Sequence, residues 1–482
     1  MSKISNVGSS LLNLAKSAEK PVENAAKSVE QSVAKLGQSA ENAAKSGAHD
    51  GADVFETVGS NLGSLKQTFV DITQPEGPKN LVPSPTLGLN TSDAQLSQLL
   101  DQTTHSTLTT GNRVGVYVDG QNALPQILSS IDSARKSICY ETYEFDKSGT
   151  TVDEVVNHLI AAKQRGVDVR VSADAIGGRE FLTSHNPELA RLKAAGIPVQ
   201  LYNPVNSLQD ADVHRDHRKS IIVDGQTAWV LGMNTGDRYM GDPSVPQRFH
   251  DVATQIQGPA VQPVLNDFLQ TWKTEGGPSI DPSTLMGPPA KPISTNQTNV
   301  SMRIIEHTPG QDENIRAAYL ALINHATTNI NVENAYPPAN DIVDALCAAA
   351  KRGVNVRYVY GSNEGALGMD ARTRFNKLLQ AGVHIYIYPT PIHTKSLSVD
   401  GTYATVGSSN VDNVSLNRNQ EIISLAQDPS YTQAYDQQVF NKDVVGTADG
   451  KKSVEIKYPL QDSFWQKLSD AVLAKLWPDS YE

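Results

Sequence analysis

The sequence predicts an α/β protein that contains two copies of one folding unit. Segments with helical patterns end in glycine and lead into short β-branched strands, which is typical of βα units and a largely parallel sheet. A polar motif, His-x-Lys-x4-Asp with an asparagine ten residues after the Asp, also occurs twice, and its copies lie 176 residues apart at all four polar positions. The motif residues are His217, Lys219, Asp224 and Asn234 in the first copy and His393, Lys395, Asp400 and Asn410 in the second. One such motif could be accidental, but two that agree in this way indicate a duplicated catalytic unit.

The predicted strands and helices recur in the same order in both halves of the chain. In the first half we expect strands at 114–118, 138–143, 167–171 and 197–202, with helices that include 152–164 and 187–195. In the second half we expect a helix at 315–328 and a strand at 330–333, and the segment 349–357 repeats the pattern of 161–170. The spacing between equivalent positions falls from 192 residues at the early strands to 185 and finally to 176 at the motif.

Most of this change in spacing lies directly before the histidine. His217 lies 13 residues after Pro204, whereas His393 lies four residues after Pro389. The first half therefore contains an additional loop at about 205–216. We expect this loop to shape the cleft on the His217 side.

At 482 residues the chain is long enough to form more than one core. We divide it into an extension at 1–90, a first half at 91–275, a linker at 276–300 and a second half at 301–482, with an amphipathic closing helix at 464–477. The extension has apolar residues in an 11-residue repeat, which suits an amphipathic helix on a membrane or a partner. Its small apolar side chains and balanced charges favour a weakly helical or disordered extension instead.

Composition excludes several classes of protein. The net charge of -11 argues against broad affinity for nucleic acid. Cys139 and Cys347 lie in apolar contexts and are predicted to be buried thiols, and two isolated cysteines exclude a Cys-based zinc cluster. The sequence contains no run of about 18 apolar residues, so we expect no membrane-spanning helix. The N-terminus lacks the features of a standard signal peptide. A cytoplasmic location, peripheral membrane contact and export by a non-standard route all stay open.

The duplicated motif suits chemistry on a phosphodiester. If each motif lies in a strand, its His and Lys share one face, and a pseudo-two-fold axis would bring both pairs to one cleft within a single chain. The lysines and the Asn234 and Asn410 amides could then hold phosphate oxygens while one histidine attacks phosphorus and the other protonates the leaving alkoxide. We expect neither a metal ion nor a cofactor, because the lysines oppose the anionic charge. Asp224 and Asp400 precede glycine, so a role in a turn is at least as strongly indicated as a catalytic one.

On these residues the chain resembles the phospholipase D superfamily, in which two HxKxxxxD motifs form one active site. The resemblance covers about 110–480 and is greatest to bacterial cardiolipin synthase-like proteins, on the segments 216–219, 232–239, 256–261 and 407–412, with Ser415, Asn419 and Glu421 following. It implies two α/β/α sandwich halves related by a pseudo-two-fold axis. It also implies a phospholipid substrate and hydrolysis or transphosphatidylation by a ping-pong mechanism through a phosphohistidine.

The resemblance further implies roles for individual residues. His217 would be the nucleophile and His393 the general acid, and an acid from each half would orient the histidine of the other half. Asp251 and Glu421 occupy those positions. We therefore expect Glu421 to orient His217 and Asp251 to orient His393, since a carboxylate fixes the tautomer of a catalytic imidazole.

Three departures from the family pattern leave the head group and the acceptor alcohol open. Leu231-Gly232-Met233-Asn234 replaces Gly-Ser-x-Asn, the Ala/Lys/Ser-rich extension replaces paired transmembrane helices, and Glu421 stands where hydrolytic phospholipases D often have Asp. Water as acceptor would give a hydrolase, and a lipid alcohol would give a synthase. The alternatives are a phosphodiesterase or nuclease of the same superfamily, which the acidic charge disfavours, and a membrane-associated scaffold with a vestigial site, which the intact motifs disfavour.

Overall fold

The computed structural model describes residues 92–178, 185–204, 214–361, 369–446, 450–458 and 460. The extension at 1–90, most of the additional loop before His217 and the closing helix predicted at 464–477 lie outside these residues. The expectations for those three segments therefore stay predictions.

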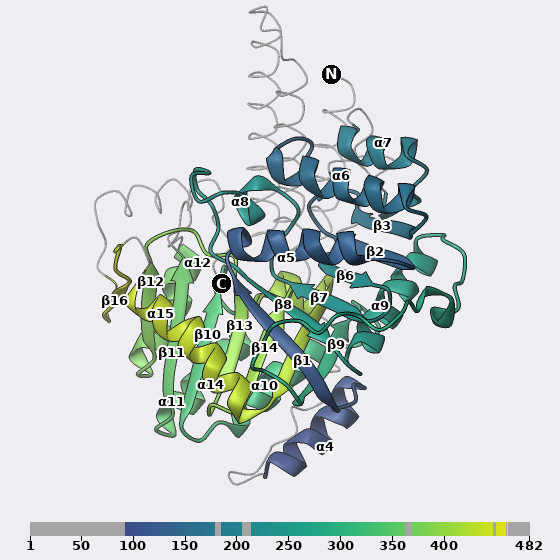
Figure 1. Cartoon of the computed structure of the whole chain (residues 1–482). Helices are drawn as coiled ribbons and strands as arrows, with labels where there is room; N and C mark the ends of the chain where they lie inside the picture. The colour runs from purple at the N-terminus through teal and green to yellow at the C-terminus, as the bar shows by residue number, and fades with distance from the viewer. Residues whose placement is uncertain are drawn as a thin grey trace, which may run out of the picture.

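The first half is a sheet covered by helices on both faces. Its strands are β1 (Thr109–Val118), β2 (Ser137–Thr142), β3 (Asp168–Asp174), β4 (Val199–Tyr202), β5 (Arg215–Asp216), β6 (Ser220–Val223), β7 (Thr227–Leu231) and β8 (Val252–Gln257). Its helices are α5 (Gly120–Ser133), α6 (Thr150–Gln164), α7 (Pro187–Ala194), α8 (Asp237–Met240) and α9 (Val261–Thr274). The apolar faces of α5, α6 and α7 pack on one side of the strands and α9 packs on the other (Figure 1).

The second half repeats this architecture. Its strands are β9 (Val300–His307), β10 (Asn329–Asn334), β11 (Asn355–Gly361), β12 (His384–Tyr388), β13 (Lys395–Val399), β14 (Tyr403–Gly407), β15 (Asn419–Gln427) and β16 (Val454–Ile456). Its helices are α10 (Asn314–His325), α11 (Asn340–Lys351), α12 (Met369–Gln380), α13 (Asn413–Asn417), α14 (Pro429–Gln438) and α15 (Phe440–Val445). A short 3-10 helix, Pro282–Leu285, interrupts the linker between the halves.

The strand order confirms the predicted duplication. From one edge the order is β16-β12-β11-β10-β13-β14-β15-β9-β1-β8-β7-β6-β2-β3-β4, with β5 paired to β15. Outward from the centre, 9-15-14-13-10-11-12 therefore mirrors 1-8-7-6-2-3-4, so the strands correspond one to one. β1 and β9 pair antiparallel at the centre, as equivalent strands of halves related by a two-fold axis do, and β1 crosses between the halves in Figure 1.

The sheet is mixed, which corrects the prediction of a largely parallel one. Parallel pairs join β2-β3-β4, β10-β11-β12 and the two-residue β5 to β15, whereas the other strand pairs in the described residues are antiparallel. The strands that follow each motif are antiparallel because tight turns join them. The turns Asp224-Gly225 and Asp400-Gly401 have positive φ at both residues, 54° and 61° in the first and 51° and 62° in the second, as the central residues of a type I′ turn require.

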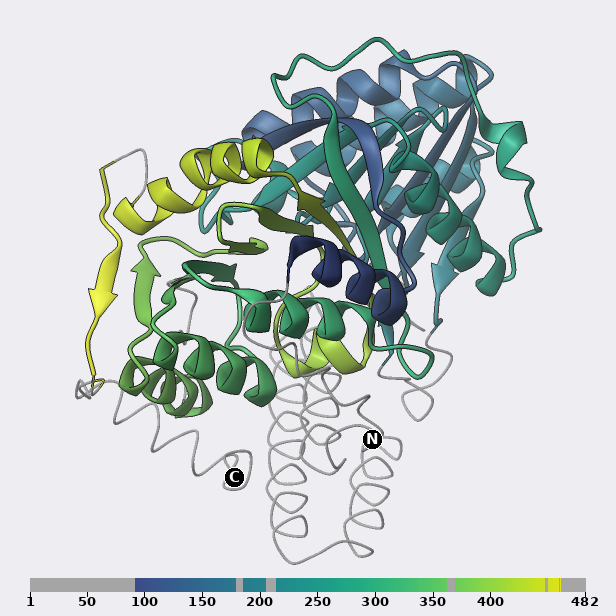
Figure 2. The ribbon, with the colours of Figure 1, turned by 90° about the horizontal axis from the view of Figure 1, so that it is seen from below.

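The helix α4 (Asp93–Thr104) belongs by sequence to the first half but packs on the second. Its Leu96 and Leu100 are fully buried in the same core as Ile315 and Leu322 of α10, and Figure 2 shows α4, in dark blue, beside α10. Nearly every side chain of α10 is buried, because the sheet covers one face and α4 the other. The boundary predicted at residue 91 assigns α4 to the first half, so sequence and packing divide the chain differently.

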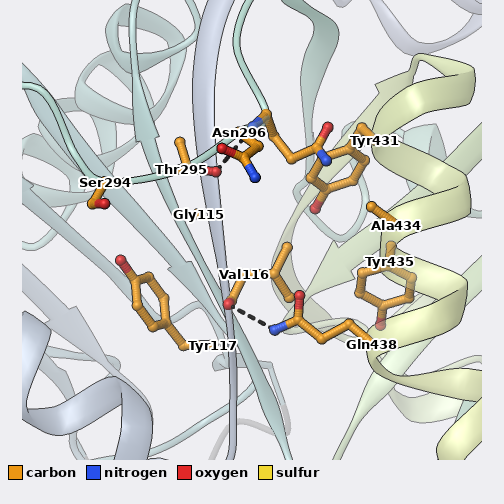
Figure 3. Close-up of a pocket in the computed structure, with 11 residues that line it drawn as sticks. Gly115, Val116, Tyr117, Ser294, Thr295, Asn296, Tyr431, Ala434, Tyr435 and Gln438 are labelled. Atoms are coloured by element: carbon orange, nitrogen blue, oxygen red, sulfur yellow. Dashed lines mark hydrogen bonds between the residues drawn. The ribbon is translucent and has the colours of Figure 1, made fainter.

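A polar pocket lies away from the motifs, between β1, the linker and α14 (Figure 3). Tyr431 and Tyr435 of α14 form one wall, and Gln438 donates a hydrogen bond to the carbonyl of Val116 at 3.2 Å. None of the predicted site residues lines this pocket. The duplicated motifs lie in another part of the molecule.

Candidate active site

Each histidine of the duplicated motif is held by a carboxylate from the other half. His217 Nδ1 lies 2.9 Å from Glu421 Oε1, and His393 Nδ1 lies 2.7 Å from Asp251 Oδ2. Both carboxylates are fully buried. When Nδ1–H donates to the carboxylate, Nε2 becomes the nitrogen that can react. The structure brings these four residues together in the crossed pairs that the resemblance implied.

Main-chain hydrogen bonds also join each motif histidine to the opposite half. The N–H of His217 donates to the carbonyl of Gln420 at 3.0 Å, and the N–H of His393 donates to the carbonyl of His250 at 2.8 Å. In each case the accepting residue directly precedes the orienting acid of the other half. The sequence predicts that each His and Lys pair lies within a strand, but the structure does not place them there. Residues 217–219 precede β6, and of His393 and Lys395 only Lys395 belongs to β13. The chain before each strand is engaged by the opposite half instead.

The two motif lysines are buried beside the histidines. Lys219 Nζ donates to the carbonyl of His217 at 2.5 Å, and Lys395 Nζ donates to the carbonyl of His393. Burial lowers the pKa of Lys219 to about 8 and that of Lys395 to about 7. The positive charge of Lys219 also lowers the pKa of Lys395. Two buried ammonium groups that repel each other favour an anionic ligand beside them.

Both imidazoles are neutral near pH 7. Burial lowers the pKa of His393 to about 3, and the charge of Lys395 adds to this effect. Burial, with Lys219 and Lys395, holds the pKa of His217 well below its usual value. A bound phosphodiester would raise both pKa values because its negative charge stabilises an imidazolium. The site is thus arranged so that the ligand itself enables one histidine to carry a proton.

The two orienting carboxylates are supported by different donors. The Ser408 hydroxyl donates to Glu421 Oε2, whereas Asp251 Oδ1 accepts the N–H of Val252 at 2.8 Å. Gly232 occupies the position equivalent to Ser408, and a Cβ there would lie 2.1 Å from Asp251 Oδ1. The departure at Gly232 therefore has a physical cause: Asp251 approaches the main chain too closely for any side chain. Burial raises the pKa of Glu421 to about 7, although Lys219 and the Ser408 hydrogen bond lower it.

The amides of the two motif asparagines differ in their hydrogen bonds. Both are buried. Asn234 Oδ1 accepts the N–H of Glu144 at 3.2 Å, which fixes the orientation of the amide and leaves its NH2 group as the donor. Asn410 Oδ1 has no hydrogen-bond partner. Both amides retain donors that suit phosphate oxygens.

Sequence reasoning missed the aromatic rings around the histidines. The ring of Tyr143 lies 4.9 Å from that of His217, and those of Tyr239 and Phe249 lie 4.9 and 5.3 Å from that of His393. These rings pack against both imidazoles and contribute to their burial. Tyr143 ends a predicted strand, and Tyr239, in α8, ends the segment 232–239 that carries the resemblance. Phe249 lies outside the helices and strands and had no such signal.

Asp224 and Asp400 do not face the histidines. The Asp224 carboxylate accepts the N–H groups of residues 135–137, at 2.7–3.2 Å, at the start of β2. Asp400 does the same for residues 327–329 at the start of β10. The contacts support the turn and anchoring role that the sequence left open for both residues.

Comparison with known families decides to which family this geometry belongs. The family model described as "Cardiolipin synthase, PLD-like domain" matches residues 127–272 and 319–444, once in each half. The chain belongs to this family. It is a phospholipase D-type enzyme, and the match in both halves agrees with the duplicated topology.

Curated relatives and a solved structure point the same way. The cardiolipin synthase A of Pectobacterium carotovorum is 31% identical over 333 residues, which are 67% of this chain and 67% of that protein. A cardiolipin synthase of Clostridium perfringens is 29% identical over 345 residues, 70% and 71% of the two chains. The phosphatidylserine synthase of Haemophilus influenzae Rd KW20 has a TM-score of 0.62 at 12% identity, covering 80% of this chain and 97% of that one. The last likeness shows the fold alone.

The family resemblance had raised the question of membrane-spanning helices. Within the part of the chain that the structure describes, no helix combines the length and the apolar character needed to cross a bilayer.

Proposed function

We propose that this enzyme transfers a phosphatidyl group between phospholipids through a covalent phosphohistidine on His217. The observation that carries the proposal is the crossed pairing of His217 with Glu421 and of His393 with Asp251, beside two buried lysines. Because each half supplies the acid for the other, one chain forms one site. Curated cardiolipin synthases are relatives over two thirds of the chain, which supports a phospholipid substrate.

In the first step, His217 Nε2 attacks the phosphorus of a bound phospholipid. The bond between phosphorus and the head-group oxygen breaks, and His393 Nε2 gives its proton to the leaving alkoxide. Lys219 and Lys395, with the Asn234 and Asn410 amides, hold the phosphate oxygens and stabilise the charge that develops on them. Glu421 and Asp251 keep Nε2 as the reacting nitrogen of each ring.

In the second step, an alcohol replaces the head group. His393, now neutral, takes the proton from the acceptor hydroxyl while its oxygen attacks phosphorus and the bond to His217 breaks. A phosphatidylglycerol hydroxyl as acceptor yields cardiolipin, with one glycerol released in the first step. The chemistry needs no metal ion, since each proton and each charge is handled by a side chain.

Mass spectrometry of reaction products tests this function. The full chain is incubated separately with phosphatidylglycerol in mixed micelles, with phosphatidylcholine and with single-stranded DNA, and a His217→Asn/His393→Asn double variant is the control. Cardiolipin and glycerol in equal amounts are expected from phosphatidylglycerol. Phosphatidate instead would identify water as the acceptor. Cleavage of DNA with no lipid turnover would overturn the proposal.

A further inference from the structure

A second buried polar cluster lies one residue away from Asp251. It consists of His250, Glu333 and Asp443, all buried, with one ligand atom from each lying within 4.8 Å of the others. His250 comes from the first half and the two acids come from β10 and α15 of the second. The mechanism proposed above uses none of these side chains.

The hydrogen bonds of the cluster leave one face of it unsatisfied. His250 Nδ1 lies 2.8 Å from Asp119 Oδ1, so this nitrogen is occupied and Nε2 points to the acids. Glu333 is fully buried, and neither of its carboxylate oxygens has a hydrogen-bond partner. The Thr394 hydroxyl nearby donates to the His250 carbonyl, and its proximity lowers the raised pKa of Glu333 only in part. A buried carboxylate without a partner is costly unless a cation satisfies it.

The equivalent cluster in the first half contains a positively charged side chain that the second half lacks at the same position. Glu141 and Asp267 are the counterparts of Glu333 and Asp443, and between them lies Arg218, which donates to Asp267. The counterpart of Arg218 in the second half is Thr394. The same pair of buried acids is thus kept in both halves, but only the first half supplies a permanently charged side chain between them.

We propose that His250 Nε2, Glu333 and Asp443 bind a divalent cation of the Zn²⁺ class, which links the two halves beside the active site. His250 Nε2 lies 3.1 Å from Asp443 Oδ2 and 3.5 Å from Glu333 Oε1. Ligands held about 2.0–2.2 Å from a tetrahedral zinc ion are about 3.3–3.5 Å from one another, so the spacing fits with small adjustments. Asp119 on Nδ1 is the outer carboxylate that zinc-bound histidines usually have.

The competing description is an imidazolium that neutralises Asp443 beside a Glu333 that carries its own proton, because burial and the charge of Asp443 raise the pKa of Glu333 well above its usual value. Burial lowers the pKa of His250, but Asp443 and Asp119 more than offset this and hold it well above its usual value. A proton on Nε2 suits the 3.1 Å contact with Asp443, yet at 3.5 Å it hardly satisfies Glu333. One divalent ion would contact all three ligands.

Metal content and spectroscopy separate the two descriptions. The full chain is purified without an affinity tag, dialysed against Zn²⁺ and then against metal-free buffer, and measured by plasma mass spectrometry. One zinc per chain is expected, with a tetrahedral d–d absorption band after Co²⁺ exchange. Chelation should lower the melting temperature by roughly 5 °C. His250→Gln and Glu333→Gln should retain no metal, whereas Glu141→Gln, the matched change in the first half, should retain it.

Two outcomes would overturn the inference. The wild-type chain could hold no ion after dialysis, which leaves the imidazolium as the counter-charge even if the variants do not fold. Alternatively, the His250 and Glu333 variants could retain as much zinc as wild type, which places the ion elsewhere. Neither result depends on lipid turnover, so the metal site and the proposed function can fail independently.

Discussion

The two halves hold their partner's histidine with the same hydrogen bond but support that bond differently. Glu421 reaches His217 and takes its second hydrogen bond from the Ser408 hydroxyl, whereas Asp251 reaches His393 and takes its second from the main chain at Val252. The longer acid is thus matched with serine and the shorter one with Gly232. The hydrogen bond to the imidazole is the same in both halves, whereas the orienting acid and the residue that contacts it both differ between the halves. We therefore expect the halves to be equivalent in fold and unequal in chemistry.

The largest effect should come from removing either histidine. His217→Asn and His393→Asn should each lower kcat by about 10³-fold or more on phosphatidylglycerol. The first variant lacks the nucleophile and the second lacks the general acid. They should differ on phosphatidyl-p-nitrophenol, whose leaving group needs no proton. There His393→Asn should still release nitrophenolate in a burst, with acid-labile phosphatidyl label on the protein.

His217→Asn should show neither the burst nor the label. Phosphoenzyme on that variant, with none on His393→Asn, would reverse the two assignments. Intact-mass spectra and circular dichroism of both variants provide the control, because they show whether each is folded and unmodified before substrate is added.

The orienting acids should give the next largest effect. Glu421→Gln and Asp251→Asn keep size but weaken the control of the tautomer, and each should cost roughly 10²-fold in kcat. Their effects on stability should differ. Burial raises the pKa of Glu421 from 4.5 to about 7, so between these values the folded state holds a proton that the unfolded state has released.

The contribution of Glu421 to stability therefore falls as pH rises from 4.5 to 7. Glu421→Gln removes this dependence, so its melting temperature should exceed that of wild type at pH 8 and approach it at pH 5. Calorimetry at both pH values measures the difference. A Glu421→Gln variant less stable than wild type at pH 8 would show that the charged form is favoured in the fold.

Ser408→Ala tests the device that only the second half has. Loss of the hydroxyl removes a hydrogen bond that lowers the pKa of Glu421, so this pKa should rise from its wild-type value of about 7. The acidic limb of kcat/KM against pH should move to higher pH by a few tenths of a unit or more, with about a tenfold loss at pH 7. Ser424→Ala is a matched control, because its hydroxyl donates to the carbonyl of Val406 and not to Glu421. An unshifted pH profile in Ser408→Ala would show that the protonation of Glu421 does not control catalysis.

The sequence was informative wherever a feature depends on local pattern or on repetition. The duplicated motif predicted the paired halves, and Asp-Gly predicted the hairpin turns. The crossed acids came from resemblance, and the structure places them as expected. Features that depend on the approach of the two halves were missed: the mixed sheet, the packing of α4 on α10, and the rings of Tyr239 and Phe249. The sequence alone identifies Gly232 only as a departure from the family motif. Its physical reason, the close approach of Asp251, depends on the folded structure.

The smallest effect on turnover should come from the motif aspartates. Asp224→Asn tolerates the positive φ of the turn but replaces one acceptor oxygen with a donor facing the amides of residues 135–137. It should lower the free energy of unfolding by about 1–3 kcal/mol, while kcat/KM of the folded enzyme stays within about threefold of wild type. Asp400→Asn should cost less, since Asp224 is buried whereas Asp400 is partly exposed and water can replace part of what is lost.

Urea unfolding and steady-state assays on the same samples make this comparison between the halves quantitative. If Asp224→Asn keeps wild-type stability but loses activity 100-fold, the aspartate takes part in catalysis despite its distance from the imidazoles. If both variants lose stability in the expected order, the two aspartates belong to the folding of the repeat. The duplication then kept the aspartate of each motif for the turn that follows the motif strand, and the histidine, lysine and asparagine for the reaction itself.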